Sequence, residues 1–111
     1  MIRKIIFFEN HFIEFYQKLN AKVKGKIQYV FELIKQVERV PEKFLKHLDG
    51  TNGLYEVRIE YQSNMYRIFC CFDKGKLVVL FNGFQKKTQK TPKKELEKAE
   101  KLMKSYFEQK K

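Results

Sequence analysis

Three neighbouring segments between residues 54 and 84 constrain the fold most, because each reads as a β-strand. Residues 54–61 alternate between apolar and polar side chains, which is typical of a strand with one buried face. Residues 65–72 and 77–84 are almost continuously apolar, which indicates central strands covered on both faces. The segments that join them are short and carry turn residues, so the sequence predicts an antiparallel meander.

Helical patterns flank these strands on both sides. Apolar residues recur at helical spacing within residues 12–19 and 22–38, and two consecutive helices with a short link indicate an antiparallel hairpin. Asn20 is expected to end the first of these helices. Thr91 is expected to cap a final helix, with Pro92 at its first position.

The complete order adds an apolar first strand within residues 1–8, which makes it β-α-α-β-β-β-α. This order predicts an α+β fold with one small antiparallel or mixed sheet, a helical hairpin on one face and a C-terminal helix. Pro41 breaks the second helix, and residues 41–45 are expected to form one helical turn. The 111 residues contain no repeat or linker, so we expect a single domain over residues 1–111.

The chain is strongly basic, with 24 lysines and arginines against 13 acids and a formal net charge of +11. Its 15% aromatic content argues against disorder. Such a charge favours nucleic acids, anionic membranes or acidic proteins as partners, although a general solubility role is the alternative. Residues 86–94 hold five lysines and no acid, and this clustering favours an anionic ligand. Lys93 and Lys94 would oppose the dipole of the final helix by about 0.3–1 kcal/mol each.

The cysteines are adjacent, and on a strand Cys70 and Cys71 point to opposite faces, so no ordinary disulfide joins them. No spacing of cysteine and histidine predicts a metal site, and no motif predicts a cofactor. Free thiols fit the reducing cytoplasm. The first apolar run is far too short to cross a membrane.

Arg58 and Arg67 are the strongest candidate pair for a chemical site. They lie on strands joined by a short turn, so their side chains are expected to be close. A planar guanidinium suits phosphate binding, whereas the structural alternative is a salt bridge to Glu56 or Glu60. His47 is a candidate general acid or base, although a lone loop histidine is more often inert.

The lysine-rich segment after the last strand supplies further candidates. Lys86, Lys87 and Lys90 lie nearest the strand end and can add charge to the same groove, and Gln89 can donate hydrogen bonds to a sugar or base. The alternative is a solvated loop without a ligand.

Three stretches give the chain a family resemblance: Leu54-Tyr55-Glu56-Val57-Arg58, Tyr66-Arg67-Ile68-Phe69 and Phe84-Gln85-Lys86-Lys87-Thr88-Gln89-Lys90-Thr91-Pro92. With these stretches the chain resembles the RelE/ParE toxin superfamily, and within it the phage-derived HigB-like branch. The resemblance extends over essentially the whole chain and agrees with the expected element order.

The resemblance implies the toxin of a type II toxin–antitoxin pair, a metal-free endoribonuclease that cuts mRNA on the ribosome by attack of a ribose 2′-hydroxyl. The implied partner is a helix-turn-helix antitoxin of the HigA type. By position, Arg58 and Arg67 match the residues that hold the scissile phosphate. Lys86 and Lys87 match the basic residues after the last strand, and His47 is only a candidate for the base.

Lys90 and Gln89 are then expected to contact RNA, and Lys93 and Lys94 to contact ribosomal RNA or an acidic surface of the antitoxin. Two other functions stay open. One is inhibition of gyrase, as on the ParE side of the superfamily, and the other is nucleic-acid binding without cleavage, which would show a steep dependence on salt.

Overall fold

The computed structural model of the protein describes residues 1–110. It contains three helices and five strands. In chain order these are β1 (Lys4–Phe7), α1 (His11–Gln17), α2 (Ala21–Gln36), β2 (Leu45–His47), β3 (Tyr55–Tyr61), β4 (Asn64–Asp73), β5 (Leu77–Lys86) and α3 (Lys93–Gln109).

The strands form one mixed sheet in the order β1-β5-β4-β3-β2, in which only β1 and β5 run parallel. The predicted α+β fold and the meander of β3, β4 and β5 are therefore confirmed. The meander turns twist in the sense that hairpins prefer, because Gln62, Ser63, Lys74 and Gly75 all adopt positive φ.

Strand β2 was not predicted. Residues 41–45 form the expected single turn, in which the N–H groups of Phe44 and Leu45 both donate to the carbonyl of Pro41, at 2.9 and 3.1 Å. Leu45–His47 then pairs antiparallel with β3 and becomes the edge of the sheet. Three residues are too few to show strand alternation, and the pairing with β3 exists only in the folded chain.

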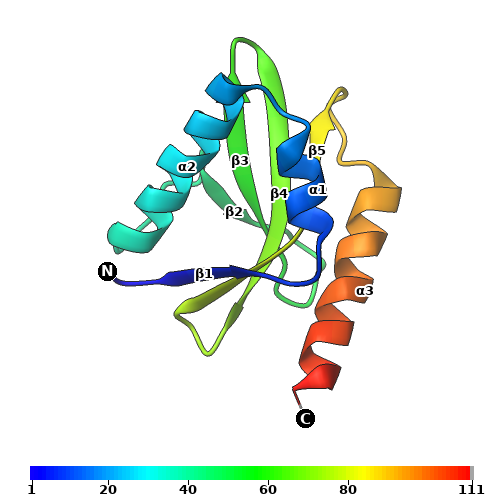
Figure 1. The fold of residues 1–111 in the computed structure, drawn as a ribbon. Helices are drawn as coiled ribbons and strands as arrows, with labels where there is room; N and C mark the ends of the chain where they lie inside the picture. The colour runs from blue at the N-terminus through cyan, green and yellow to red at the C-terminus, as the bar shows by residue number, and fades with distance from the viewer. Residues whose placement is uncertain (111) are drawn as a thin grey trace.

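Helices α1 and α2 cover one face of the sheet and α3 covers part of the other (Figure 1). The larger core cluster, under α1 and α2, includes Ile27, Ile34, Val57 and Ile68. A second cluster under α3 includes Phe69 and other residues of β4 and β5. Because α3 packs on β5 and β4, the same face of β3 stays open to solvent at its Arg58 side.

The helix ends differ from the expected caps at two places. Asn20 does not end the first helix but caps α2, where its side chain accepts the N–H of Val23 at 2.9 Å. Thr91 does not cap α3, because Pro92 occupies the cap position without a side-chain hydrogen bond. The end of α2 is held by Arg3, whose guanidinium donates to carbonyls of residues 34, 37 and 38.

Among the described residues 1–110, no helix combines the length and the apolar character that crossing a membrane requires.

Candidate functional site

Arg58 of β3 and Arg67 of β4 lie directly opposite each other in the antiparallel register. The alternation of β3 turns Val57 and Ile59 into the core under α2, so Arg58 points to the other, partly open face. Arg67 shares this face, because its neighbours Tyr66 and Ile68 also belong to the core under the helical hairpin. The expected proximity of the two arginines is confirmed.

One carboxylate lies between the two guanidinium groups. Oε1 of Glu56 is 3.5 Å from Nε of Arg58 and 3.6 Å from Nε of Arg67, while its Oε2 is buried without a hydrogen-bond partner. The salt bridge considered from the sequence is therefore present, but it is shared. A single carboxylate cannot neutralise two cations, so the group keeps one positive charge in excess.

Arg67 is 4% exposed and its donors are only partly used. Nη1 donates to the carbonyl of Tyr66 at 3.1 Å, Nη2 lies 3.8 Å from the sulfur of Met65, and Nε has no hydrogen-bond partner. Burial lowers the pKa of Arg67, and the charge of Glu56 opposes that change. A buried cation with unused donors is costly, and an anion that accepts from those donors would relieve the cost.

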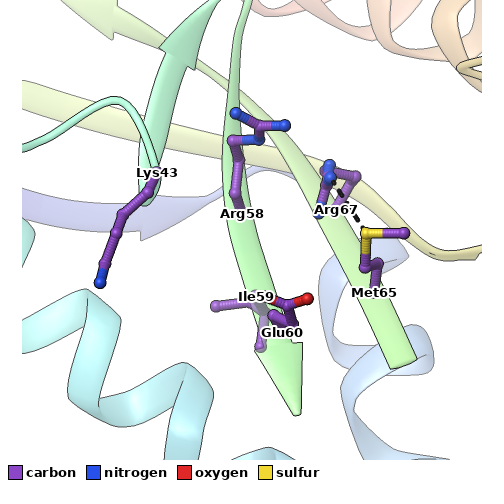
Figure 2. A pocket seen from close by; sticks show the side chains of 6 residues that line it. All are labelled: Lys43, Arg58, Ile59, Glu60, Met65 and Arg67. Atoms are coloured by element: carbon purple, nitrogen blue, oxygen red, sulfur yellow. Dashed lines mark hydrogen bonds between the residues drawn. The ribbon is translucent and has the colours of Figure 1, made fainter. Parts of the chain in front are cut away.

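A hollow of about 170 Å³ adjoins the arginines (Figure 2). It is lined by Lys43, Arg58, Ile59, Glu60, Met65 and Arg67. Figure 2 shows the thioether of Met65 beside the guanidinium of Arg67, where a flexible side chain can move aside. The volume is below the roughly 300–1,000 Å³ of pockets for whole small molecules, and it suits a group such as phosphate on a longer ligand.

The start of the lysine-rich segment extends the same face. Lys86 pairs with Met65 across β4 and β5, and the next hollow, between the β3–β4 turn and the segment after β5, is lined by Lys86, Lys87 and Gln89 among others. Partial burial lowers the pKa of Lys86, and the positive charge of Arg67 lowers it further. The structure thus brings Lys86 to the arginines, with Lys87 and Gln89 beside it.

Lys46 is a cation of this face that the sequence analysis did not select. It pairs with Glu56 across β2 and β3, and its charge also depresses the pKa of Lys86. The sequence feature that could have identified Lys46 is its position one residue before His47. Adjacent residues of a strand point to opposite faces of the sheet, so Lys46 and His47 lie on opposite sides. The signal is readable only after residues 45–47 are known to form a strand.

His47 lies on the other face of the sheet. Its ring packs edge-on against Tyr55, with centroids 5.1 Å apart, and Tyr55 belongs to the core under α2. Its nearest carboxylate is that of Asp49, at 3.8 Å. The sheet therefore separates His47 from the arginines, and this histidine takes no part in the chemistry proposed below.

The remaining lysines lie farther along the chain. Lys90 is exposed in the loop, and Lys93 and Lys94 occupy the first turn of α3, as expected. Lys93 lies 3.9 Å from Glu97, one turn later, but it is almost fully exposed, so this pair adds little stability. None of the three lines either hollow.

The cysteines take no part in this site. Cys70 and Cys71 are buried in different core clusters, on opposite faces as predicted. Burial raises the pKa of both thiols, that of Cys71 to about 12. Within residues 1–110, no three histidine, cysteine, aspartate or glutamate side chains come together as metal ligands.

Two arginines that line a hollow, with a lysine beside them, can bind a phosphodiester once Met65 moves aside, and can stabilise extra negative charge on it. Preorganised donors that face developing charge are often the largest contribution to catalysis. The geometry therefore defines a cationic clamp on an open sheet face, which we call the arginine clamp: Arg58, Arg67 and their shared Glu56.

The fold is also found in a solved protein. The chain is similar to a structure described as an archaeal RelE-RelB complex from Pyrococcus horikoshii OT3, with a TM-score of 0.53 and 23% identity. The similarity covers 75% of this chain and 93% of that one. Among curated proteins, no sequence matches the chain.

The chain thus has a RelE-like fold. Residues 14–104 match the family described as "Phage derived protein Gp49-like (DUF891)", and the chain belongs to this Gp49-like family. Its assignment to a HigB-like branch stays a prediction.

Proposed function

We propose that the protein is the toxin of a toxin–antitoxin pair and that it cleaves mRNA at the arginine clamp. Membership of the Gp49-like family and the RelE-like fold support the toxin assignment. The observation that carries the cleavage proposal is the pair of opposed arginines with one shared carboxylate, beside a hollow of phosphate size. The substrate would be met in the cytoplasm, on the ribosome.

The proposed reaction is attack of a ribose 2′-oxygen on the adjacent phosphorus. A bond forms between the 2′-oxygen and phosphorus, and the bond from phosphorus to the 5′-oxygen breaks. The products are a 2′,3′-cyclic phosphate and a 5′-hydroxyl end. Arg58 and Arg67 would donate hydrogen bonds to the non-bridging oxygens, whose negative charge grows in the transition state.

The reaction also requires a proton to leave the 2′-hydroxyl and another to reach the 5′-oxygen. Lys86 is the candidate on this face for both transfers. Because burial and neighbouring cations lower its pKa, its neutral amine would accept the proton of the 2′-hydroxyl, and the resulting ammonium would donate a proton to the departing 5′-oxygen. Lys46, whose charge reaches Lys86, and Lys87, beside it in the loop, would hold the RNA backbone. Lys90, Lys93, Lys94 and Gln89 would extend this contact to RNA.

The partner we propose is an antitoxin that covers the clamp. The similar archaeal structure is a RelE-RelB complex, and this supports an antitoxin partner for the present chain. A helix-turn-helix antitoxin of the HigA type is the specific form that we propose.

Mapping of mRNA 5′ ends after induction in bacteria tests the function. We expect new 5′-hydroxyl ends inside open reading frames with the wild-type chain and none with Arg67→Ala. Double-strand DNA breaks without new RNA ends would contradict cleavage and favour gyrase inhibition. RNA binding without new ends would reduce the function to binding alone.

A further inference from the structure

A second group of cations and aromatic rings adjoins the hollow at its Lys43 side. Tyr29 of α2 is 54% exposed, and its ring packs edge-on against Phe44 with centroids 6.4 Å apart. Nζ of Lys26 lies 5.4 Å from the centre of the Tyr29 ring, and Nζ of Lys43 lies 5.0 Å from that of Phe44. We call Lys26, Tyr29, Lys43 and Phe44 the aromatic platform.

Stability does not account for the charge around this platform. The first turn of α2 contains no acid but includes Lys22 and Lys24, and cations there oppose the helix dipole. Within residues 1–110, Lys22, Lys24, Lys26 and Lys43 form no ion pair with a carboxylate. An anionic ligand would be attracted to this surface.

The platform is joined directly to the arginine clamp. Lys43 lines the hollow, and in Figure 2 its side chain runs away from Arg58. The carbonyl of Phe44 accepts the backbone N–H of Arg58 at 2.8 Å, and the carbonyl of Glu42 accepts from Nη1 of Arg58 at 3.5 Å. Phe44 and Tyr29 lie on the α2 side of the sheet, so a ligand that leaves the hollow at Lys43 must pass around the sheet edge at the start of β2 to reach their rings.

We propose that this platform binds single-stranded RNA next to the phosphate held by the clamp, with a base stacked on the exposed ring of Tyr29 and the two lysines against the backbone. The inference rests on the proposed function. Aromatic rings between cations are the usual means of binding single strands, and stacking on them tolerates any base. The platform would therefore add affinity without adding sequence preference.

Binding of RNA whose 2′-hydroxyls are methylated, and which cannot be cleaved, tests the platform apart from catalysis. For a strand of about ten nucleotides, Tyr29→Ala should weaken binding by about fivefold to a hundredfold in fluorescence anisotropy. Tyr29→Phe keeps the ring and should bind like the wild type. A dinucleotide, which fills only the clamp, should bind both variants equally in an NMR titration.

Phe107→Ala is the matched control, because Phe107 is a partly exposed ring on α3, away from the platform. It should leave binding unchanged. Equal binding of the longer RNA by Tyr29→Ala and wild type overturns the platform. If Arg67→Ala still loses binding in that case, the proposed function stands. If Tyr29→Ala instead escapes neutralisation by the antitoxin while RNA binding is unchanged, the surface binds protein and our inference is wrong.

Discussion

Arg58 and Arg67 face each other across β3 and β4, and both approach the same oxygen of Glu56, at 3.5 and 3.6 Å. Like charges directly opposite each other destabilise a sheet. The shared carboxylate reduces this cost but does not remove it, and the buried Nε of Arg67, a residue that lines the hollow, has no hydrogen-bond partner. The arrangement costs stability and creates a site that attracts anions.

Arg67→Ala should abolish growth arrest. By analogy with the loss of one oxyanion donor, we expect the cleavage rate to fall by about 10²–10³. The measurement is growth after induction, together with cleavage of a reporter mRNA. Lys76→Ala, which removes an exposed cation at the far end of the β4–β5 hairpin, is the control. Full toxicity of a folded Arg67→Ala protein would contradict the proposed cleavage of mRNA at the arginine clamp.

Glu56→Gln should destabilise the protein by about 1–3 kcal/mol, because it removes the buried carboxylate that the two opposed guanidinium groups share. Urea unfolding measures this change. Glu60→Gln is the matched control on the same face, since Glu60 is exposed and should change stability by less than about 0.5 kcal/mol.

Inorganic phosphate should restore part of the stability lost in Glu56→Gln, because an anion bound only to the folded state stabilises it. The gain should be larger for this variant than for the wild type, in which the carboxylate competes with phosphate. Equal gains in the two proteins would show that phosphate does not bind at the clamp.

Stability should also depend on Asp73, which anchors the end of α3. Lys110 and Tyr106 donate hydrogen bonds to its carboxylate and lower its pKa. A depressed folded pKa stabilises the protein above the ordinary carboxyl pKa of about 3.9, and this stabilisation disappears as the pH falls through the folded value. Asp73→Asn should thus be less stable than wild type at neutral pH, and the difference should shrink as the pH falls below the ordinary carboxyl pKa of about 3.9. A difference that stays constant with pH would contradict this.

Tyr106 should titrate later than an ordinary tyrosine. Burial, and then its hydrogen bond to Asp73, raise its pKa to about 12. Absorbance of tyrosinate during an alkaline titration measures this, with Tyr106→Phe to identify the late step. In Asp73→Asn the pKa of Tyr106 should fall only part of the way to that of an ordinary tyrosine, because the burial of Tyr106 remains. A late step that persists in Tyr106→Phe would assign it to another tyrosine.

Gly83→Ala and Gly25→Ala should change stability in opposite directions. A Cβ at Gly83 would lie 2.5 Å from the ring of Phe15, so this ring must shift, at a cost of about 1–3 kcal/mol. Gly25 lies exposed in α2 with no atom within 4 Å of an added Cβ, so alanine there should stabilise by about 0.5–1 kcal/mol. Thermal unfolding measures both. A stable Gly83→Ala protein would contradict the close packing of α1 on β5.

Sequence patterns predicted the elements that depend on local physics. The alternation of β3, the apolar runs of β4 and β5 and their short turns predicted the meander, and with it the proximity of Arg58 and Arg67. The helix caps were harder to predict. Asn20 and Thr91 are residue types that favour helix ends, but the path of the folded chain decides which backbone group each side chain can reach.

The sequence by itself thus determined the strand meander, the helical hairpin and the paired arginines, because side-chain periodicity and turn chemistry act between near neighbours. Only the tertiary structure decided that residues 45–47 pair with β3, which turns Lys46 towards Glu56 and His47 away from it. It also decided that one buried carboxylate serves both arginines and that Tyr29 lies beside Phe44. Such contacts join residues distant along the chain, and they depend on how the edge strand and α2 pack against the sheet.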